Sequence, residues 1–250
     1  DALPEVDFQL EDKLPRVLLA GAPAGHLTEA GARRLDPTGR LQPGALLCPP
    51  EGDAGTGMTA TNTVAVRTGN VSAGTSIFAM LVLEKSLAKY HPEIDMVTTP
   101  DGMPVAMVHC NNGTSETDAW IRIFAEFAEL LGLDADKPKL YELLYRHALT
   151  GDPSGGGIAS VNYLAGEPIT GLHAGRPLYV RRPDSQLNLA NFMLSQLYAI
   201  VATLKLGMDI LTEEEGVRVD ELVGHGGIFK TEGVMQSIMA SALNIPTAVY

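Results

Sequence analysis

The sequence predicts an α/β fold, and three observations lead to this prediction. Residues 71–108 contain short apolar runs separated by turn signals, which is typical of strands. The period then changes, because residues 116–133 carry apolar side chains at helical spacing. Residues 219–250 follow the order strand, glycine loop, helix, strand, which is an α/β unit with a candidate ligand loop at the carboxyl end of a strand.

The individual elements follow from the same patterns. The segment before residue 50 is rich in proline, glycine and alanine, so we expect the end of a preceding domain or a linker, with a strand at 45–48. The elements expected after it are, in chain order, a glycine turn over 52–57 leading into a short helix, a strand over 71–83, a hairpin of strands 96–99 and 105–110, helices over 116–133, 139–148 and 189–210, a strand over 219–223, a helix over 231–244 and a strand over 247–250. Ser115 and Asp118 resemble a capping box, and the nearly apolar helix 189–210 should be buried at the centre.

Composition limits the function classes. A chain of 250 residues can form one large domain or two small ones, and its formal charge of −12 argues against a nucleic-acid surface. No apolar run approaches the length of a membrane span, and the first residues lack the features of a signal peptide. Cys48 and Cys110 lie in apolar strand-like runs, so we expect buried free thiols and a cytoplasmic protein.

A lone carboxylate and a small-residue step form the first candidate site. Asp53 follows the apolar run 45–48, and Gly74-Thr75-Ser76 interrupts the strand expected over 71–83. Glycine lets a backbone approach a ligand closely, and successive N–H groups can hold phosphate oxygens. Phosphoryl transfer to a hydroxyl needs such a site beside an acid that accepts the hydroxyl proton. Two ordinary glycine turns are the alternative.

A second glycine pair, Gly226-Gly227, lies between a predicted strand and a predicted helix. It suits the ribose or base of a nucleotide, because the helix N-terminus adds a favourable dipole, and it also suits a simple tight turn. Neither glycine segment carries the dinucleotide fingerprint or the Lys-Ser/Thr end of a Walker loop. The six histidines are scattered without metal-ligand spacing, so we expect no zinc site, and no side chain is assigned as a metal ligand.

Taken in order, these pieces resemble the carboxy-terminal half of an FGGY-family carbohydrate kinase, of the xylulokinase, ribulokinase and glycerol kinase type. The resemblance is carried by Leu3–Val6, Ala24–Thr28, Gly52–Asp53, Gly69–Ser76, Trp120, Tyr163–Glu167 and Gly226–Gly227. It implies the actin-like, ribonuclease-H-like ATPase architecture of two α/β lobes around a cleft. Residues 1–50 would be the end of the amino-terminal sugar-binding lobe and a linker, and residues 51–250 most of the ATP-binding lobe, incomplete at its end.

The resemblance also implies roles for particular residues. Asp53 would be the general base that takes the proton from the sugar hydroxyl. The residues implied to bind ATP are Gly74, Thr75 and Ser76 at the phosphates, Gly226 and Gly227 against the adenosine, and Thr231 as a polar contact. The implied reaction is ATP- and Mg²⁺-dependent phosphorylation of a ketopentose, ketohexose or related polyol. The implied partners are the sugar and ATP, without nucleic acid or membrane, and a homodimer is left open.

Departures from the family pattern keep two other functions open. The usual Glu-Arg-x-Pro is replaced by Gly166-Glu167-Pro168-Ile169, and Leu178–Arg182 takes the place of a glycine-containing turn. The family's amino-terminal Asp-x-Gly-Thr motif belongs to a lobe that these residues do not include. An actin-like ATP-binding switch module or a catalytically degenerate sugar sensor are therefore the alternatives to a kinase.

Overall fold

The computed structural model describes residues 10–249, which form two compact units. The first unit comprises the residues up to Asp53 together with Pro100–Gly102, and the second comprises the rest. In the first unit, a short 3₁₀ helix at Leu10–Lys13 precedes two short elements, the antiparallel strand pair β1 (Gly25–His26) and β2 (Leu46–Leu47) and the helix α1 (Glu29–Leu35). The Thr28 hydroxyl caps α1 by accepting a hydrogen bond from the Gly31 N–H at 3.0 Å.

The second unit is built on a six-stranded mixed sheet with the strand order β10-β9-β3-β4-β6-β5. Its strands are β3 (Thr68–Ala73), β4 (Ile77–Val82), β5 (Ile94–Thr98), β6 (Pro104–Cys110), β9 (Glu221–His225) and β10 (Thr247–Val249). Strands β3, β9 and β10 are parallel, and the remaining neighbours are antiparallel. The predicted hairpin of two strands around residue 101 is confirmed as β5 and β6.

One sequence prediction about this sheet is wrong. A single strand was expected over 71–83, but the chain reverses at Gly74-Thr75-Ser76 and forms the antiparallel pair β3 and β4. The reversal is stabilised by the Gly74 N–H, which donates to the Ser76 carbonyl at 2.8 Å. The Gly74-Thr75-Ser76 step is therefore the turn of a hairpin, and its backbone carbonyls are bonded by residues far away in the sequence.

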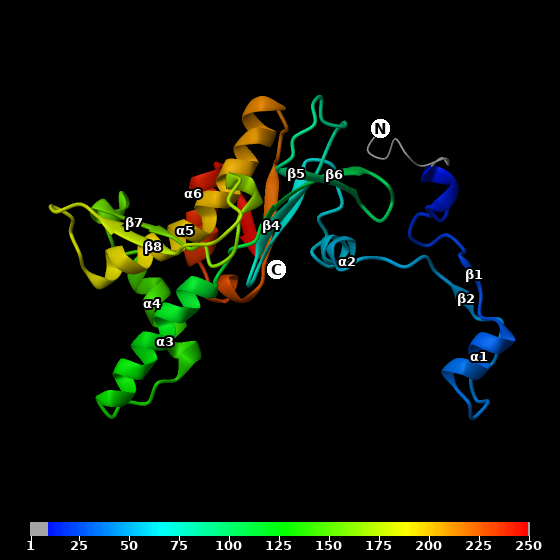
Figure 1. The fold of residues 1–250 in the computed structure, drawn as a ribbon, viewed down its shortest axis with the longest axis horizontal. Helices are drawn as coiled ribbons and strands as arrows, with labels where there is room; N and C mark the ends of the chain where they lie inside the picture. The colour runs from blue at the N-terminus through cyan, green and yellow to red at the C-terminus, as the bar shows by residue number, and fades with distance from the viewer. Residues whose placement is uncertain (1–9, 250) are drawn as a thin grey trace. The chain divides into compact units, whose positions relative to one another are not determined.

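The second unit also contains several helices, some of which lie on the two faces of this sheet. They are α2 (Asp53–Ala60), α3 (Ser115–Leu130), α4 (Lys137–Ala148), α5 (Leu189–Asp209) and α6 (Val234–Leu243), and a separate antiparallel pair is formed by β7 (Ile158–Val161) and β8 (Leu178–Arg181). Side chains of β4 alternate between the faces: Ile77, Ala79 and Leu81 join the large core under α5 and α6, whereas Met80 and Val82 join a smaller cluster with Met58 of α2. Figure 1 shows α5 and α6 lying together on one side of the sheet and α2 on the other.

Two local predictions near the helices are corrected. The glycine turn expected over 52–57 is part of helix α2, because the burial of Met58 in an apolar cluster outweighs the poor helix propensity of the glycines. The capping box expected at Ser115 is not formed: the N-cap of α3 is Thr114, and its hydroxyl donates to Asp118 Oδ2 at 3.2 Å rather than capping the helix.

The buried central helix predicted over 189–210 is confirmed as α5, most of whose residues are buried. Together with the π-helical turn Ile210–Glu214 it is long and apolar enough to cross a membrane, which the sequence reading did not anticipate. However, 72% of its most apolar window lies inside the protein, as in the core helix of a globular fold.

The two cysteines are both free but differ in environment. Cys110 is fully buried at the end of β6, as predicted, and burial raises the pKa of its thiol. Cys48 is exposed, and that part of the prediction is wrong. Cys48 directly follows β2, and the two leucines of β2 are exposed as well. A pair of two-residue strands is too short to bury side chains in a core of its own.

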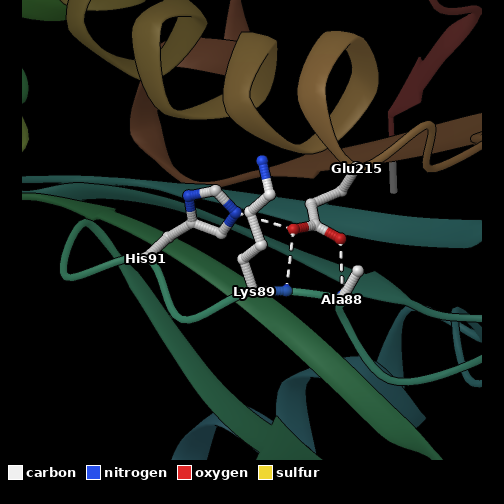
Figure 2. A network of polar contacts seen from close by, with 4 residues as sticks. All are labelled: Ala88, Lys89, His91 and Glu215. Carbon is white, nitrogen blue, oxygen red and sulfur yellow. Dashed lines mark hydrogen bonds and ion pairs between the residues drawn. The ribbon is translucent and has the colours of Figure 1, made fainter.

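A buried carboxylate joins the end of α5 to the loop after β4. Glu215 accepts hydrogen bonds from the Ala88 N–H at 2.6 Å and the Lys89 N–H at 3.1 Å, and its Oε1 lies 2.7 Å from His91 Nε2 (Figure 2). The His91 and Glu215 side chains are only 10% and 4% exposed. These hydrogen bonds, first of all the one from Ala88, lower the pKa of Glu215 below its ordinary value.

This arrangement predicts an acid-dependent contribution to stability. Because the pKa of Glu215 is lower in the folded than in the unfolded protein, its carboxylate stabilises the fold at neutral pH. This stabilisation is lost as the pH falls through about 4.3, the pKa of an unfolded glutamate, and then through the folded-state pKa. We expect Glu215→Gln to lower the melting temperature at pH 7 and the difference from wild type to shrink below pH 4. Thermal unfolding from pH 3 to 8 measures this, with Glu214→Gln, an exposed neighbour, as the matched control. A difference in melting temperature between Glu215→Gln and wild type that stays constant with pH would contradict this contribution of the Glu215 carboxylate.

Candidate functional site

A cavity of about 560 Å³ opens where the parallel strands β3 and β9 end. Ala73 and Gly74 from the end of β3, the first turn of α3 and one face of α4 line it, together with Gly227, Ile228, Lys230 and Thr231 from the segment after β9. Ligands in α/β sheets bind outside the carboxyl ends of the strands, and small-molecule sites have volumes of this size. The position of the cavity therefore follows from the parallel pairing of two strands that are far apart in the sequence.

Glycine is required where the two strand ends meet. Gly226 has φ 112° and ψ 174°, a conformation essentially restricted to glycine, and a Cβ added there would lie 2.2 Å from the Ala73 carbonyl oxygen. By contrast, a Cβ added to Gly74 or Gly227 would meet nothing within 4 Å. Gly226 therefore brings the β9 loop against β3, whereas Gly74 and Gly227 leave exposed backbone at the cavity.

The first turn of α3 is joined to the β3–β4 turn by backbone hydrogen bonds. The Gly113 N–H donates to the Thr75 carbonyl at 2.7 Å, and the Thr114 N–H donates to the Gly74 carbonyl at 2.9 Å. These bonds satisfy the carbonyls of the turn and place the α3 N-terminus, the positive end of the helix dipole, at the cavity. The arrangement suits an anionic group.

Asp118 and Tyr141 form a hydrogen-bonded pair on the cavity wall. The Tyr141 hydroxyl donates to Asp118 Oδ1 at 2.8 Å, and the Thr114 hydroxyl donates to the other oxygen. Burial, followed by the hydrogen bond to Asp118, raises the pKa of Tyr141 to about 12, so the phenol remains a donor at neutral pH. Lys137 and Lys230 line the same cavity and carry positive charge, and Glu142 adds a second carboxylate to the lining.

The structure brings together only some of the predicted site residues. Gly74, Gly227 and Thr231 line the 560 Å³ cavity, and Gly226 lines a neighbouring one of about 530 Å³ that also contains Gly227. Thr75 and Ser76 complete the β3–β4 turn without lining either cavity. Asp53 is the exposed first residue of α2 and belongs to the first unit, whereas both cavities lie in the second.

Sequence reasoning missed the contribution of α3 and α4. Asp118 was interpreted as a capping residue, and Lys137, Tyr141 and Tyr145 were not considered. A signal for the last three was present, because their spacing of four residues places them on one face of α4. A helix face that carries both a lysine and tyrosines is neither a typical core face nor a typical solvent-exposed face.

Comparisons with known proteins agree with this geometry. The model of the FGGY family of carbohydrate kinases, C-terminal domain, matches residues 69–250. The sequence has no significant match among curated proteins. Three similar solved structures are a xylulose kinase from Rhodospirillum rubrum (14% identity, TM-score 0.75, covering 94% of this chain and 44% of that one), a gluconate kinase from Lactobacillus acidophilus (16%, 0.69, 96% and 45%) and a glycerol kinase from Plasmodium falciparum with ADP (13%, 0.64, 83% and 40%).

This chain thus spans less than half the length of each of these kinases. At such low identities the structural likeness establishes the fold, which is the second lobe of the actin-like, ribonuclease-H-like ATPase architecture, as predicted. The family model matches most of the chain, from the first strand of the central sheet onward. The chain belongs to the FGGY family of carbohydrate kinases.

Proposed function

We propose that this chain forms the ATP-binding half of a cytoplasmic kinase that phosphorylates a hydroxyl of a ketopentose, a ketohexose or a related polyol. The observation that carries the proposal is the cavity between the Gly74 turn, the Gly227 loop and the start of α3. Two of its walls are exposed glycine backbone, and Lys137 and Lys230 provide positive charge. Free cysteines at positions 48 and 110 fit a reducing compartment.

The cavity fits a nucleoside triphosphate. Its volume suits a ligand of that size, and side chains are absent from Gly74, where phosphates would approach the backbone, and from Gly227, where the adenosine would lie. Among the residues from 10 to 249, no three His, Cys, Asp or Glu side chains are close enough together to hold a metal ion. Mg²⁺ would therefore be held mainly by phosphate oxygens and water, and it would neutralise charge that develops on the phosphates.

In the proposed reaction the sugar oxygen forms a bond to the γ-phosphorus while the bond from that phosphorus to the ADP oxygen breaks. Asp53 accepts the proton of the attacking hydroxyl, a role that rests on its place in the family motif. Lys137 and Lys230 would stabilise the transferred charge. The similar structures act on xylulose, gluconate and glycerol, so the acceptor is proposed only as a class.

Calorimetric titration of this chain with MgATP tests the nucleotide site. We expect saturable binding, and we expect Gly227→Trp to abolish it, because the space beside Gly227 is open and an indole would fill it. Leu133→Trp is the matched control, since Leu133 is 60% exposed just beyond α3 and does not line the cavity. Binding that survives in Gly227→Trp would place the nucleotide elsewhere, and absence of binding to the wild-type chain would contradict a preformed site.

A further inference from the structure

A fully buried carboxylate lies behind the proposed nucleotide site without contacting the cavity. Glu167 follows β7 in the chain and has no exposed surface. Its Oε2 accepts hydrogen bonds from the Asn112 side-chain amide at 2.9 Å and from the Asn112 backbone N–H at 3.3 Å. Its Oε1 has no hydrogen-bond partner within the described part of the chain. Burying a carboxylate is costly, so the contacts that it makes with Asn112 require an explanation.

Asn112 is held by the whole segment that leads to Glu167. Its Oδ1 accepts from the backbone N–H groups of Leu164 at 2.8 Å and Ala165 at 2.9 Å. Asn162, also buried, donates from Nδ2 to the carbonyls of Asn112 at 3.1 Å and Gly113 at 2.8 Å. The backbone between β6 and α3 is therefore fixed by side chains and amides about 50 residues further along the chain.

This fixed backbone carries the turn that faces the cavity. Gly113 and Thr114 donate their N–H groups to the carbonyls of Thr75 and Gly74, and a Cβ on Gly113 would lie 2.2 Å from the Gly74 oxygen. Gly74 and Thr114 both line the 560 Å³ cavity. Hydrogen bonds thus join the Glu167 carboxylate to Asn112, and further hydrogen bonds join the next two residues of the chain, Gly113 and Thr114, to the Gly74 turn.

We propose that Glu167 is a positioning residue that sets the backbone of the Gly74 turn and the start of α3 for nucleotide binding, an inference that rests on the proposed function. It acts through Asn112 and touches neither nucleotide nor sugar. Removal of the acceptor leaves the Asn112 backbone N–H and one of its two side-chain N–H groups unpaired in a buried site, while the other still has the Ala165 carbonyl at 3.3 Å, so the segment shifts to find other partners. The turn carbonyls bonded to Gly113 and Thr114 then shift with it.

Three variants of this chain separate positioning from general stability. Glu167→Gln can keep an oxygen at the Oε2 position and place its NH₂ group at the unpartnered Oε1 position. Glu167→Met has similar length but accepts no hydrogen bond. Tyr163→Phe is the control in the same segment, because it removes only the buried hydroxyl contact with Thr203 at 2.8 Å.

We expect Glu167→Met to weaken MgATP binding about tenfold and to speed hydrogen exchange of the Gly113 and Thr114 amides about tenfold, whereas Glu167→Gln stays near wild type. Tyr163→Phe should lower the denaturation midpoint without either effect. If Glu167→Met matches Tyr163→Phe in both readouts, the proposal is overturned. If wild type fails to bind MgATP, the proposed function fails, and exchange at Gly113 and Thr114 still decides whether Glu167 sets this turn.

Discussion

Turnover is expected to fall by about 10³-fold when Asp53 is replaced by asparagine in the proposed kinase, while MgATP affinity stays within about twofold. Asparagine has nearly the same shape as aspartate but cannot take a proton from the attacking hydroxyl. Proton transfer by a positioned side chain contributes about 10²–10⁴-fold to rate, so its loss appears in kcat. Asp53 does not line the proposed ATP cavity, so nucleotide affinity should be nearly unchanged.

The measurement is sugar-dependent ADP release, with calorimetry for MgATP. Glu51→Gln is the matched control, because Glu51 is an exposed carboxylate two positions before Asp53 that accepts a hydrogen bond only from the neighbouring Gly52 N–H among the contacts described. We expect Glu51→Gln to keep normal turnover. Normal turnover in Asp53→Asn would show that another group accepts the proton. ADP release that is independent of sugar would favour the ATP-binding switch over the kinase.

Gly226→Ala should be among the most destabilising single changes in the second unit. The new Cβ would lie 2.2 Å from the Ala73 carbonyl oxygen, and residue 226 would also be held in a backbone region essentially restricted to glycine. Overpacking and backbone strain each cost about 1–3 kcal/mol, so we expect a loss of about 3 kcal/mol in the free energy of unfolding. MgATP binding should weaken as well, because the strand ends that form the cavity are forced apart.

Gly227→Ala provides the comparison for this change. It lies one residue further on, its φ is not in the left-handed region, and an added Cβ meets nothing within 4 Å. The free energies of unfolding of the two variants, measured in urea, should therefore differ by about 3 kcal/mol. That of Gly227→Ala should lie within about 0.5 kcal/mol of wild type. Equal midpoints for the two variants would mean that the close approach at Ala73 is not present in solution.

Local patterns predicted much of the fold. The β5–β6 hairpin and the buried helix α5 were evident from period and composition, because each forms largely from residues close together in the sequence. The Gly74 reversal was missed because Thr75 and Gly74 are held by Gly113 and Thr114, which local reading does not connect to them. The short helix expected after the glycine turn is α2, but it begins earlier than predicted, at Asp53, for the same reason, since the burial of Met58 against the sheet is a tertiary effect.

The candidate site likewise combines residues with a local sequence signal and residues that are paired only through distant contacts. Gly74, Gly227 and Thr231 could be proposed as cavity residues from glycine steps and the family resemblance, and the structure places all three there. Their roles toward ATP stay predictions, as does the role of Asp53. Asp118 pairs with Tyr141, and Glu167 pairs with Asn112, across long stretches of chain. Such pairs carry no local signature, because neither partner alone has an unusual neighbourhood in the sequence.

The parallel pairing of β3 with β9 also sets the order in which the protein can be assembled. Arg67 and Asp220, which flank these strands and hydrogen-bond to each other, are 153 residues apart along the chain. At ribosomal speeds of about 5–20 residues per second, β3 waits roughly 8–30 s for its partner. During that time β3 is an uncovered sheet edge, which is a template for wrong pairing and a natural target for chaperones. The cavity is lined by residues up to Thr231, which follow β9, so nucleotide binding by a nascent chain would report that synthesis has passed β9.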